Sequence, residues 1–236
     1  MDGVLLRKCV VEFIGTFFLV FVIGCVSSQA HVLLAPLAIG ATLMVMIFAG
    51  GHISGAHYNP AVTLGVWISG AYNGLEAAFY VVAQLIGAVA ASIAVPILFG
   101  HTITAITTSS PLQVVLAEFL GTFALVYTVL NVATAPATAG NSFYGLAIGF
   151  TVFVQAVAVG SVSGGAFNPA VALGASVLGA VKAHSILIYW LTELFAAAAA
   201  AGIFRFLVLQ DRAAQTGSNP ESNCRGDLTY KLLTVE

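Results

Sequence analysis

The sequence predicts an all-α membrane protein with six transmembrane helices and two shorter re-entrant half-helices, arranged as an inverted repeat. Three observations predict this fold class: an apolar composition, an internal duplication, and two Asn-Pro-Ala turns that each open a short apolar segment. Of the 236 residues, 60% are hydrophobic and only 7% are charged. A soluble domain of this length cannot bury so much apolar surface, whereas a bilayer offers apolar solvent on all sides.

Charged residues are rare along the apolar part of the chain. Between Phe13 and Phe204 they are limited to Glu76, Glu118, Lys182 and Glu193. The net charge of −2 and the lack of a basic patch argue against nucleic acid as a partner. The three cysteines lack metal-ligand spacing, and the sequence has neither a nucleophile–His–Asp arrangement nor a phosphate-binding loop. We therefore expect no enzyme activity, no cofactor and no metal site, and the lipid bilayer and small uncharged molecules as partners.

An internal duplication organises the chain. Three segments recur in the same order in both halves: an opening that contains Glu, a Leu-Ala-Ile-Gly tetrapeptide, and a loop that ends in Asn-Pro-Ala-Val. The first copies are residues 11–17, 37–40 and 54–62, and the second copies are residues 117–123, 146–149 and 163–171. Matching segments in matching order indicate one duplicated structural unit.

Each repeat contains three apolar stretches near the length of about 20 residues that a transmembrane helix needs. In chain order they cover about 9–29, 34–52, 75–99, 112–134, 143–161 and 184–209. Between the second and third stretch of each unit lies a shorter apolar piece, about 60–70 and 169–179, which is too short to cross a bilayer. Because three spans per unit is an odd number, the second copy must insert upside down. Interrupted helices at matching positions of an inverted repeat indicate a solute site at the bilayer midplane.

The chain is expected to form a single channel domain over residues 1–210. Repeat one covers about 9–100 and repeat two about 112–210, and residues 211–236 are expected to be a disordered cytoplasmic tail because they are polar. Basic residues precede the first span and follow the sixth, at Arg7, Lys8, Arg205, Arg212, Arg225 and Lys231. Since basic flanks are retained in the cytoplasm, both termini are predicted to be cytoplasmic.

The turns Asn59-Pro60-Ala61 and Asn168-Pro169-Ala170 each open one of the short apolar helices. Pro suits the first helical position, Asn is a good N-cap, and the N-terminus of a helix carries partial positive charge. Two such helices entering from opposite faces would meet at the midplane with two Asn amide donors and two positive dipole ends. This centre interrupts a proton-carrying chain of waters and disfavours cations. The sequence therefore predicts a passive channel for water and small uncharged solutes.

The irregular loops before the two Asn residues are expected to expose backbone carbonyls, since non-helical backbone at membrane depth must line a wet cavity or be buried in protein. Carbonyl acceptors along one wall would replace the hydrogen-bond partners that a permeating water loses. The residues assigned to this role are Ala56, His57, Tyr58, Gly164, Ala166 and Phe167.

With these motifs the chain resembles the aquaporin, or major intrinsic protein, family. Residues 51–62, Gly-His-Ile-Ser-Gly-Ala-His-Tyr-Asn-Pro-Ala-Val, are similar to that family's first pore loop nearly residue for residue. Residues 83–87 and the Glu-Phe pairs at 12–13 and 118–119 also match, and the resemblance covers about 9–209. It implies an aquaporin-like fold, a right-handed six-helix bundle with one pore per subunit, and a homotetramer. Residues 123–129 are similar to plant vacuolar members, which slightly favours a vacuolar or other internal membrane over the plasma membrane.

The resemblance also implies an outer selectivity filter of four residues, where this chain departs from the usual pattern. Carried over by spacing from the two turns, the filter positions are Ile39, Ala156, Gly165 and Val171. Val171 stands where the family usually has Arg. A small, apolar ring is expected to be wider and drier, so that glycerol, urea and ammonia become candidate solutes besides water. The missing Arg also removes one barrier to protons and cations, so we expect their exclusion to be weaker.

One acid lies one turn inside the opening helix of each repeat: Glu12 in the first repeat and Glu118 in the second. An acid within the membrane is a functional hypothesis by default, and one version is a proton relay in a proton-coupled small-solute transporter. The resemblance implies instead that each acid braces a pore loop by accepting backbone N–H groups, which is the interpretation we favour. A closed structural or junctional membrane protein is a third alternative, because pore-lining residues do not report whether a pore is open. Glu193, in the sixth helix, is interpreted as a buried acceptor or a neutral acid.

Overall fold

The computed structural model describes residues 2–28, 32–100 and 110–215. Every regular element in these ranges is helical, and six of the helices are long and apolar enough to cross a membrane. The long helices are α1 (Gly3–Ser27), α2 (Ala35–Ser54), α4 (Gly74–Phe99), α5 (Pro111–Val129), α6 (Tyr144–Ser163) and α8 (Ile186–Gln215), and the short ones are α3 (Pro60–Ser69) and α7 (Pro169–Val177). Single turns of 3₁₀ or π helix cover Val32–Leu34, Leu130–Thr134, Pro136–Thr138 and Ala183–Ser185. The predicted fold class is confirmed.

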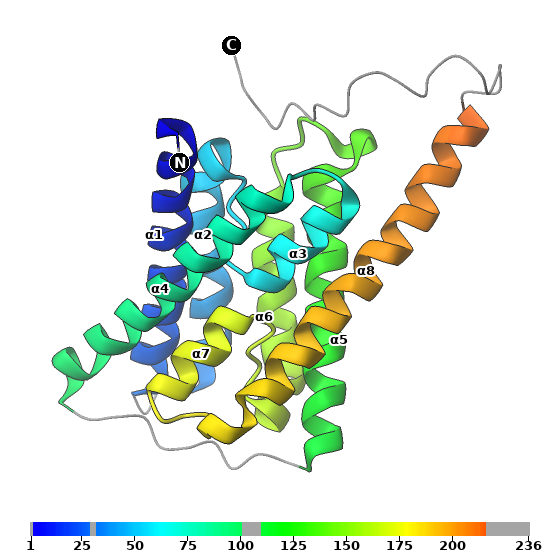
Figure 1. Cartoon of the computed structure of the whole chain (residues 1–236). Coiled ribbons are helices and arrows are strands. Elements are labelled where there is room, and N and C mark those ends of the chain that lie inside the picture. The colour runs from blue at the N-terminus through cyan, green and yellow to red at the C-terminus, as the bar shows by residue number, and fades with distance from the viewer. Residues whose placement is uncertain (1, 29–31, 101–109, 216–236) are drawn as a thin grey trace.

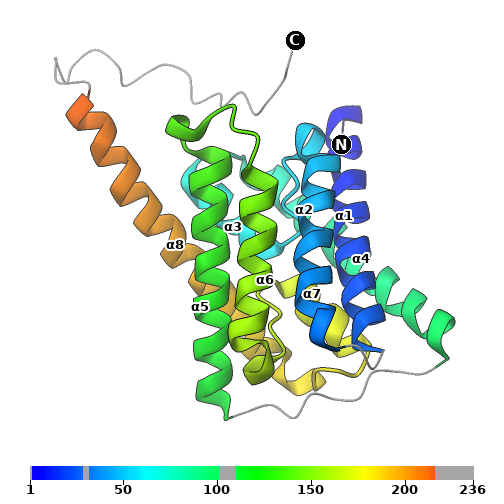
Figure 2. The ribbon, with the colours of Figure 1, turned by 180° about the vertical axis from the view of Figure 1, so that it is seen from behind.

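The short helix of each repeat packs against a long helix of the other repeat (Figure 1, Figure 2). In the first repeat α1 packs against α2 and α4, and in the second α5 packs against α6 and α8. Helices α2 and α6 pack together across the boundary between the repeats, while α3 packs against α8 and α7 against α4. Each half-helix therefore reaches into the other repeat. The first turn of α1 and the last turns of α8 lie at the same end of the bundle (Figure 1), as an even number of spans requires.

Two helix boundaries differ from the sequence-based expectation. Helix α1 begins at Gly3, ahead of the expected start near residue 9, because Asp2 caps it with a 2.7 Å bond from the Leu5 N–H to its carboxylate. Helix α8 continues to Gln215, past the expected domain boundary at 210, since good helix formers follow one another there without Gly or Pro. The rest of the expected tail, residues 216–236, lies outside the described residues.

The outward faces of the long helices carry large apolar side chains. Ile97 of α4, Leu112 of α5, and Leu191 and Phe195 of α8 are all largely exposed. A water-soluble protein would bury such residues, whereas a transmembrane helix presents them to lipid. The chain is therefore an integral, multi-pass membrane protein.

Helices α2 and α6 approach each other through two glycines. A Cβ placed on Gly149 would lie 2.5 Å from the Gly40 carbonyl oxygen, and one placed on Gly40 would lie 2.6 Å from the Gly149 carbonyl oxygen. Backbone atoms cannot move aside as a side-chain tip can. Small residues thus set the distance at which the two repeats meet, as at many helix contacts in membranes.

Gly149→Ala is accordingly expected to push α2 and α6 apart and to destabilise the protein by about 1–3 kcal/mol, the usual cost of overpacking. Thermal unfolding in detergent would measure the effect as a lower midpoint. Gly202→Ala on α8 is the matched control, because a Cβ there meets nothing within 4 Å. Equal midpoints for the two variants would contradict the close-contact explanation.

Candidate functional site

The two Asn-Pro-Ala turns are built by the same local chemistry. Gly55 and Gly164 cap the C-terminal ends of α2 and α6, and their φ values of 87° and 91° are left-handed and suit glycine. After a short loop, Asn59 caps α3 and Asn168 caps α7, each followed by Pro at the first helical position. The Asn59 side-chain oxygen accepts the Ala61 N–H at 2.8 Å, and that of Asn168 accepts the Ala170 N–H at 2.9 Å. The N-cap roles predicted for both Asn residues are therefore what the structure shows.

The loops before the two turns hold strained backbone. Ala56, Tyr58 and Phe167 have φ values of 53°, 51° and 48°, and they are the only non-glycine residues with positive φ in the described part of the chain. Such conformations persist only where the surroundings hold them in place. Their confinement to the two pore loops shows that these loops are held by specific contacts, which come mainly from two buried carboxylates.

Glu12 of α1 holds the first loop. One carboxylate oxygen accepts the Ser54 hydroxyl at 2.7 Å and the His57 N–H at 2.9 Å. The other oxygen accepts the Tyr58 N–H at 2.7 Å and the Gln84 amide at 2.8 Å. Glu12 is completely buried, so these four donors replace the water that a carboxylate would otherwise require.

Glu118 of α5 holds the second loop in the same way. It accepts the Ser163 hydroxyl at 2.6 Å, the Ala166 N–H at 3.0 Å and the Phe167 N–H at 2.7 Å. Like Glu12 it is fully buried. These are the bonds that the predicted loop-bracing role requires, and they fix the loops in which the strained residues lie.

The two Asn side chains also join the loops to each other. The Asn59 amide donates to the Phe167 carbonyl at 2.9 Å, and the Asn168 amide donates to the Tyr58 carbonyl at 2.9 Å. An Asn amide has two N–H groups, so this reciprocal pair leaves one N–H of each Asn for the pore. The turns therefore do meet, and the Phe167 and Tyr58 carbonyls have partners within the protein.

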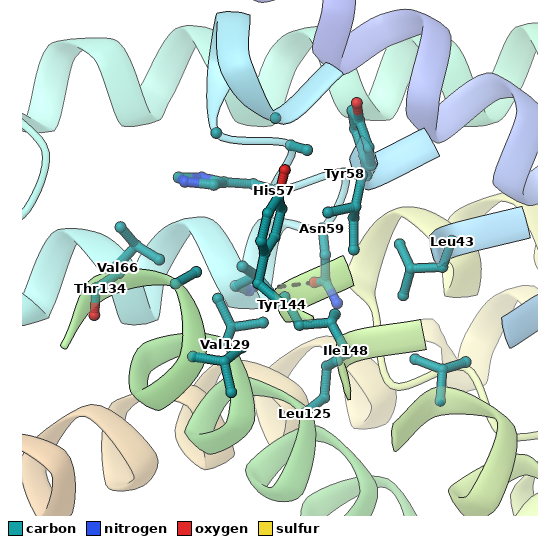
Figure 3. Close-up of a pocket in the computed structure, with 18 of the residues that line it drawn as sticks. Leu43, His57, Tyr58, Asn59, Val66, Leu125, Val129, Thr134, Tyr144 and Ile148 are labelled. Atoms are coloured by element: carbon teal, nitrogen blue, oxygen red, sulfur yellow. Dashed lines mark hydrogen bonds between the residues drawn. The ribbon is translucent and has the colours of Figure 1, made fainter. Parts of the chain in front are cut away.

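Both Asn residues line a cavity of about 480 Å³ whose walls are mostly apolar. Figure 3 shows the amide of Asn59 pointing into the space between aliphatic side chains of α2, α5 and α6. These side chains are Leu43, Leu125, Val129 and Ile148, with Val66 of α3 farther along. Tyr144 and Thr134 add hydroxyl groups to the wall. An apolar cavity with a few convergent polar groups on its wall suits a small, weakly held solute.

The predicted filter residues are brought together only in part. Ile39, Gly165 and Val171 line the cavity. Ala156 of α6 is not among its lining residues, although Val152, one turn earlier on the same helix, is. The assignment of Ala156 rested on ungapped spacing, which takes no account of how a helix is rotated. The filter itself stays a prediction.

The predicted carbonyl wall is likewise divided. Ala56, His57, Tyr58 and Ala166 line the cavity, whereas Gly164 and Phe167 are not among the lining residues. Gly164 closes α6 as its left-handed cap. The bond from Asn59 holds the Phe167 carbonyl between the loops.

Several residues that support the site were not singled out from the sequence. The hydroxyl groups of Tyr72 and Tyr80 donate to the Ser54 carbonyl at 2.8 and 2.7 Å, and the Tyr189 hydroxyl donates to the Ser163 carbonyl. Tyr80 and Tyr189 occupy equivalent positions of the two repeats, which is a signal that the sequence did contain. Among the described residues, no group of three or more His, Cys, Asp or Glu side chains could hold a metal ion.

Comparisons with known proteins agree with this architecture. Residues 3–204 match the sequence profile of the family described as Major intrinsic protein. The chain is 33% identical to "Aquaporin NIP1-4" of Oryza sativa subsp. japonica over 219 residues, covering 89% of this chain and 80% of the relative. It is 32% identical to "Nodulin-26" of Glycine max over 238 residues, covering 96% and 87%.

The fold has a solved counterpart in the aquaglyceroporin of Plasmodium falciparum. The TM-score is 0.70 at 21% identity, covering 85% of this chain and 93% of that chain. At this identity the likeness concerns the fold alone.

Proposed function

The chain belongs to the major intrinsic protein family and is a passive membrane channel rather than an enzyme, and we propose that it conducts small neutral solutes such as glycerol, urea and ammonia besides water. The observation that carries this proposal is the composition of the cavity wall near the second turn. Val171 lies in the first turn of α7, with Ile39 and Gly165 on the same cavity. No charged side chain is among the lining residues within the described part of the chain.

Solute size is the property that such a ring would control. Val, Ile and Gly side chains are short and donate no hydrogen bonds, so they neither narrow the passage as an Arg side chain does nor hold a water by charge. The name "Aquaporin" of a similar protein is consistent with water as one of these solutes. A passage wide enough for glycerol also admits urea and ammonia.

Cation exclusion would then depend on the centre of the pore. The N-termini of α3 and α7 bring two positive dipole ends together, and Asn59 and Asn168 each keep one amide donor for the solute. We expect this centre to exclude cations, though less strongly than a pore that also carries an Arg.

The geometry gives no support to a proton-coupled transporter. Glu12 and Glu118 are fully buried, and both oxygens of each accept bonds from loop residues. A carboxylate that must take up and release a proton in each cycle would break those bonds. Neither acid lines the cavity.

Liposomes containing the purified protein are expected to swell in both a glycerol gradient and a water gradient faster than empty liposomes. The rates should be equal in both directions and unchanged by a proton uncoupler, because a passive channel has no coupled ion. Stopped-flow light scattering would measure them. Liposomes that contain folded protein but show no increase with any solute would indicate the closed structural alternative.

We also propose a homotetramer with both termini in the cytoplasm, and a vacuolar or other internal membrane ahead of the plasma membrane. The basic residues near both ends of the chain support the orientation. Native mass spectrometry would measure the subunit number, and a fluorescent fusion would locate the membrane.

A further inference from the structure

The two repeats differ at one buried position beside the second pore turn. In the first repeat Gln84 of α4 stands next to Glu12, and in the second Glu193 of α8 stands next to Glu118. All four side chains are completely buried. The amide–carboxylate pair of the first repeat is thus replaced by two carboxyl groups.

Glu193 makes a direct contact with the pore residue itself. One of its carboxyl oxygens accepts the backbone N–H of Asn168 at 3.0 Å. Asn168 in turn donates its side-chain amide to the Tyr58 carbonyl of the opposite loop. Glu193 therefore holds the residue that presents one of the two donors at the pore centre.

The other oxygen of Glu193 has no donor. It is buried and lacks a hydrogen-bond partner, while the carboxyl group of Glu118 lies within hydrogen-bonding reach. Two ionised carboxylates this close together and away from water repel each other strongly, and they would leave the second Glu193 oxygen without a hydrogen-bond donor. One proton between them removes the repulsion and supplies a short O–H···O⁻ bond.

Within the described residues, the helices α3, α5 and α7 that pack against α8 carry no basic side chain that could compensate a second ionised carboxylate. Helices α3 and α7, which both pack against α8, contain no ionisable side chain. The titratable groups that interact with Glu193 are Glu118 on α5 and the Tyr189 hydroxyl on α8, which donates to the Ser163 carbonyl.

A second difference between the repeats matches the first. The Gln84 amide donates to Glu12 at 2.8 Å and also to the Thr63 hydroxyl at 3.0 Å. The residue equivalent to Thr63 in the second repeat is Ala172, which offers no acceptor. The side chain at position 84 therefore has two acceptors to satisfy, Glu12 and Thr63, whereas the side chain at position 193 has only one, Glu118. A protonated carboxyl group donates one hydrogen bond, which is enough for position 193.

We propose that the Glu193 carboxyl group is protonated and that its O–H donates a hydrogen bond to Glu118. This proton-sharing pair positions Asn168 at the pore centre. Glu193 is a positioning residue, since it does not line the cavity. The proton is a fixed part of the structure and is not transported. The effect on permeability rests on the proposed channel function, whereas the location of the proton does not.

Infrared spectroscopy of the full chain in lipid at pH 7 tests the proton directly. The wild type is expected to show a carbonyl stretch of a protonated carboxyl group that disappears in Glu193→Gln. The double variant Gln84→Glu with Thr63→Ala rebuilds the second-repeat arrangement in the first repeat and is expected to add a second such band. A wild-type spectrum that matches Glu193→Gln in this region would overturn the proposal, whatever the channel conducts.

Permeability of the same liposomes tests the positioning role. Glu193→Gln keeps an acceptor for the Asn168 N–H and a donor for Glu118, so its water permeability should stay within about twofold of the wild type. Glu193→Leu removes both the acceptor and the donor, so its water permeability should fall at least about tenfold, a change of about 1.4 kcal/mol in the barrier. Loss of permeability in Glu193→Gln to the level of Glu193→Leu would refute the role. If Glu193→Leu does not fold, the comparison of wild type with Glu193→Gln by both methods still decides it.

Discussion

Replacing Glu12 by alanine is expected to destabilise the protein by roughly 3–5 kcal/mol, because it leaves several buried donors unsatisfied at a cost of about 1–3 kcal/mol each. The change leaves four buried donors without their acceptor, namely the Ser54 hydroxyl, the His57 and Tyr58 N–H groups and the Gln84 amide. It also releases two loop residues that have left-handed backbone, Ala56 and Tyr58. Thermal unfolding in detergent and the yield of monodisperse protein would measure the loss, and water permeability of any folded fraction should fall at least about tenfold.

Glu76→Gln is the control for this prediction. Glu76 is also an acid of the first repeat, but it pairs with Lys8 at 2.7 Å near the end of the bundle, where both side chains retain access to solvent. Such ion pairs contribute about 0–1 kcal/mol. If Glu12→Ala were no more harmful than Glu76→Gln, the bracing role of Glu12 would be wrong. Conversely, a proton relay predicts a stable Glu12→Gln variant whose flux loses its dependence on a proton gradient.

Val171→Arg is expected to reduce glycerol permeability at least about tenfold while water permeability changes by less than about threefold, a difference of about 0.7 kcal/mol or more between the two barriers. Val171 lines the cavity beside Ile39 and Gly165, so a long cationic side chain there occupies the space that a solute larger than water needs. The added charge should also lower any leak of cations. Stopped-flow swelling in glycerol and water gradients would measure the two permeabilities. A pH-sensitive dye inside the liposomes would measure the leak of protons.

Val171→Leu separates the effect of size from that of charge. It adds bulk at the same position without a cation, so it should lower glycerol permeability less than Arg and leave the leak of cations unchanged. Unaltered glycerol permeability in Val171→Arg would show that the constriction lies elsewhere. Val152 would then be the next position to test, since it lines the cavity where Ala156 does not.

Much of the fold could be predicted because its signals are local and occur twice. Span lengths follow from bilayer thickness, and the half-helices follow from the N-cap chemistry of Asn-Pro at Asn59 and Asn168. The inverted arrangement follows from three spans in each copy. The errors were confined to the ends of α1 and α8, where a capping residue and a run of helix formers decide the boundary.

The filter shows where this reasoning stops. Counting residues from Asn168 placed Gly165 and Val171 on the cavity wall, because both are only three residues from the Asn. It did not bring Ala156 there, because that residue is on a different helix whose rotation depends on its packing against α2 and α5.

The sequence by itself determined the membrane class, the six spans, the two half-helices and the family, because hydrophobicity, helix length and capping act between near neighbours in the chain. Only the tertiary structure decided which polar groups meet. Asn59 reaches the Phe167 carbonyl across 108 positions of sequence, and Glu193 reaches the Asn168 N–H from a separate helix. Hydrogen bonds act over about 3 Å and depend on direction, so the packing of whole helices must be known before such partners can be assigned.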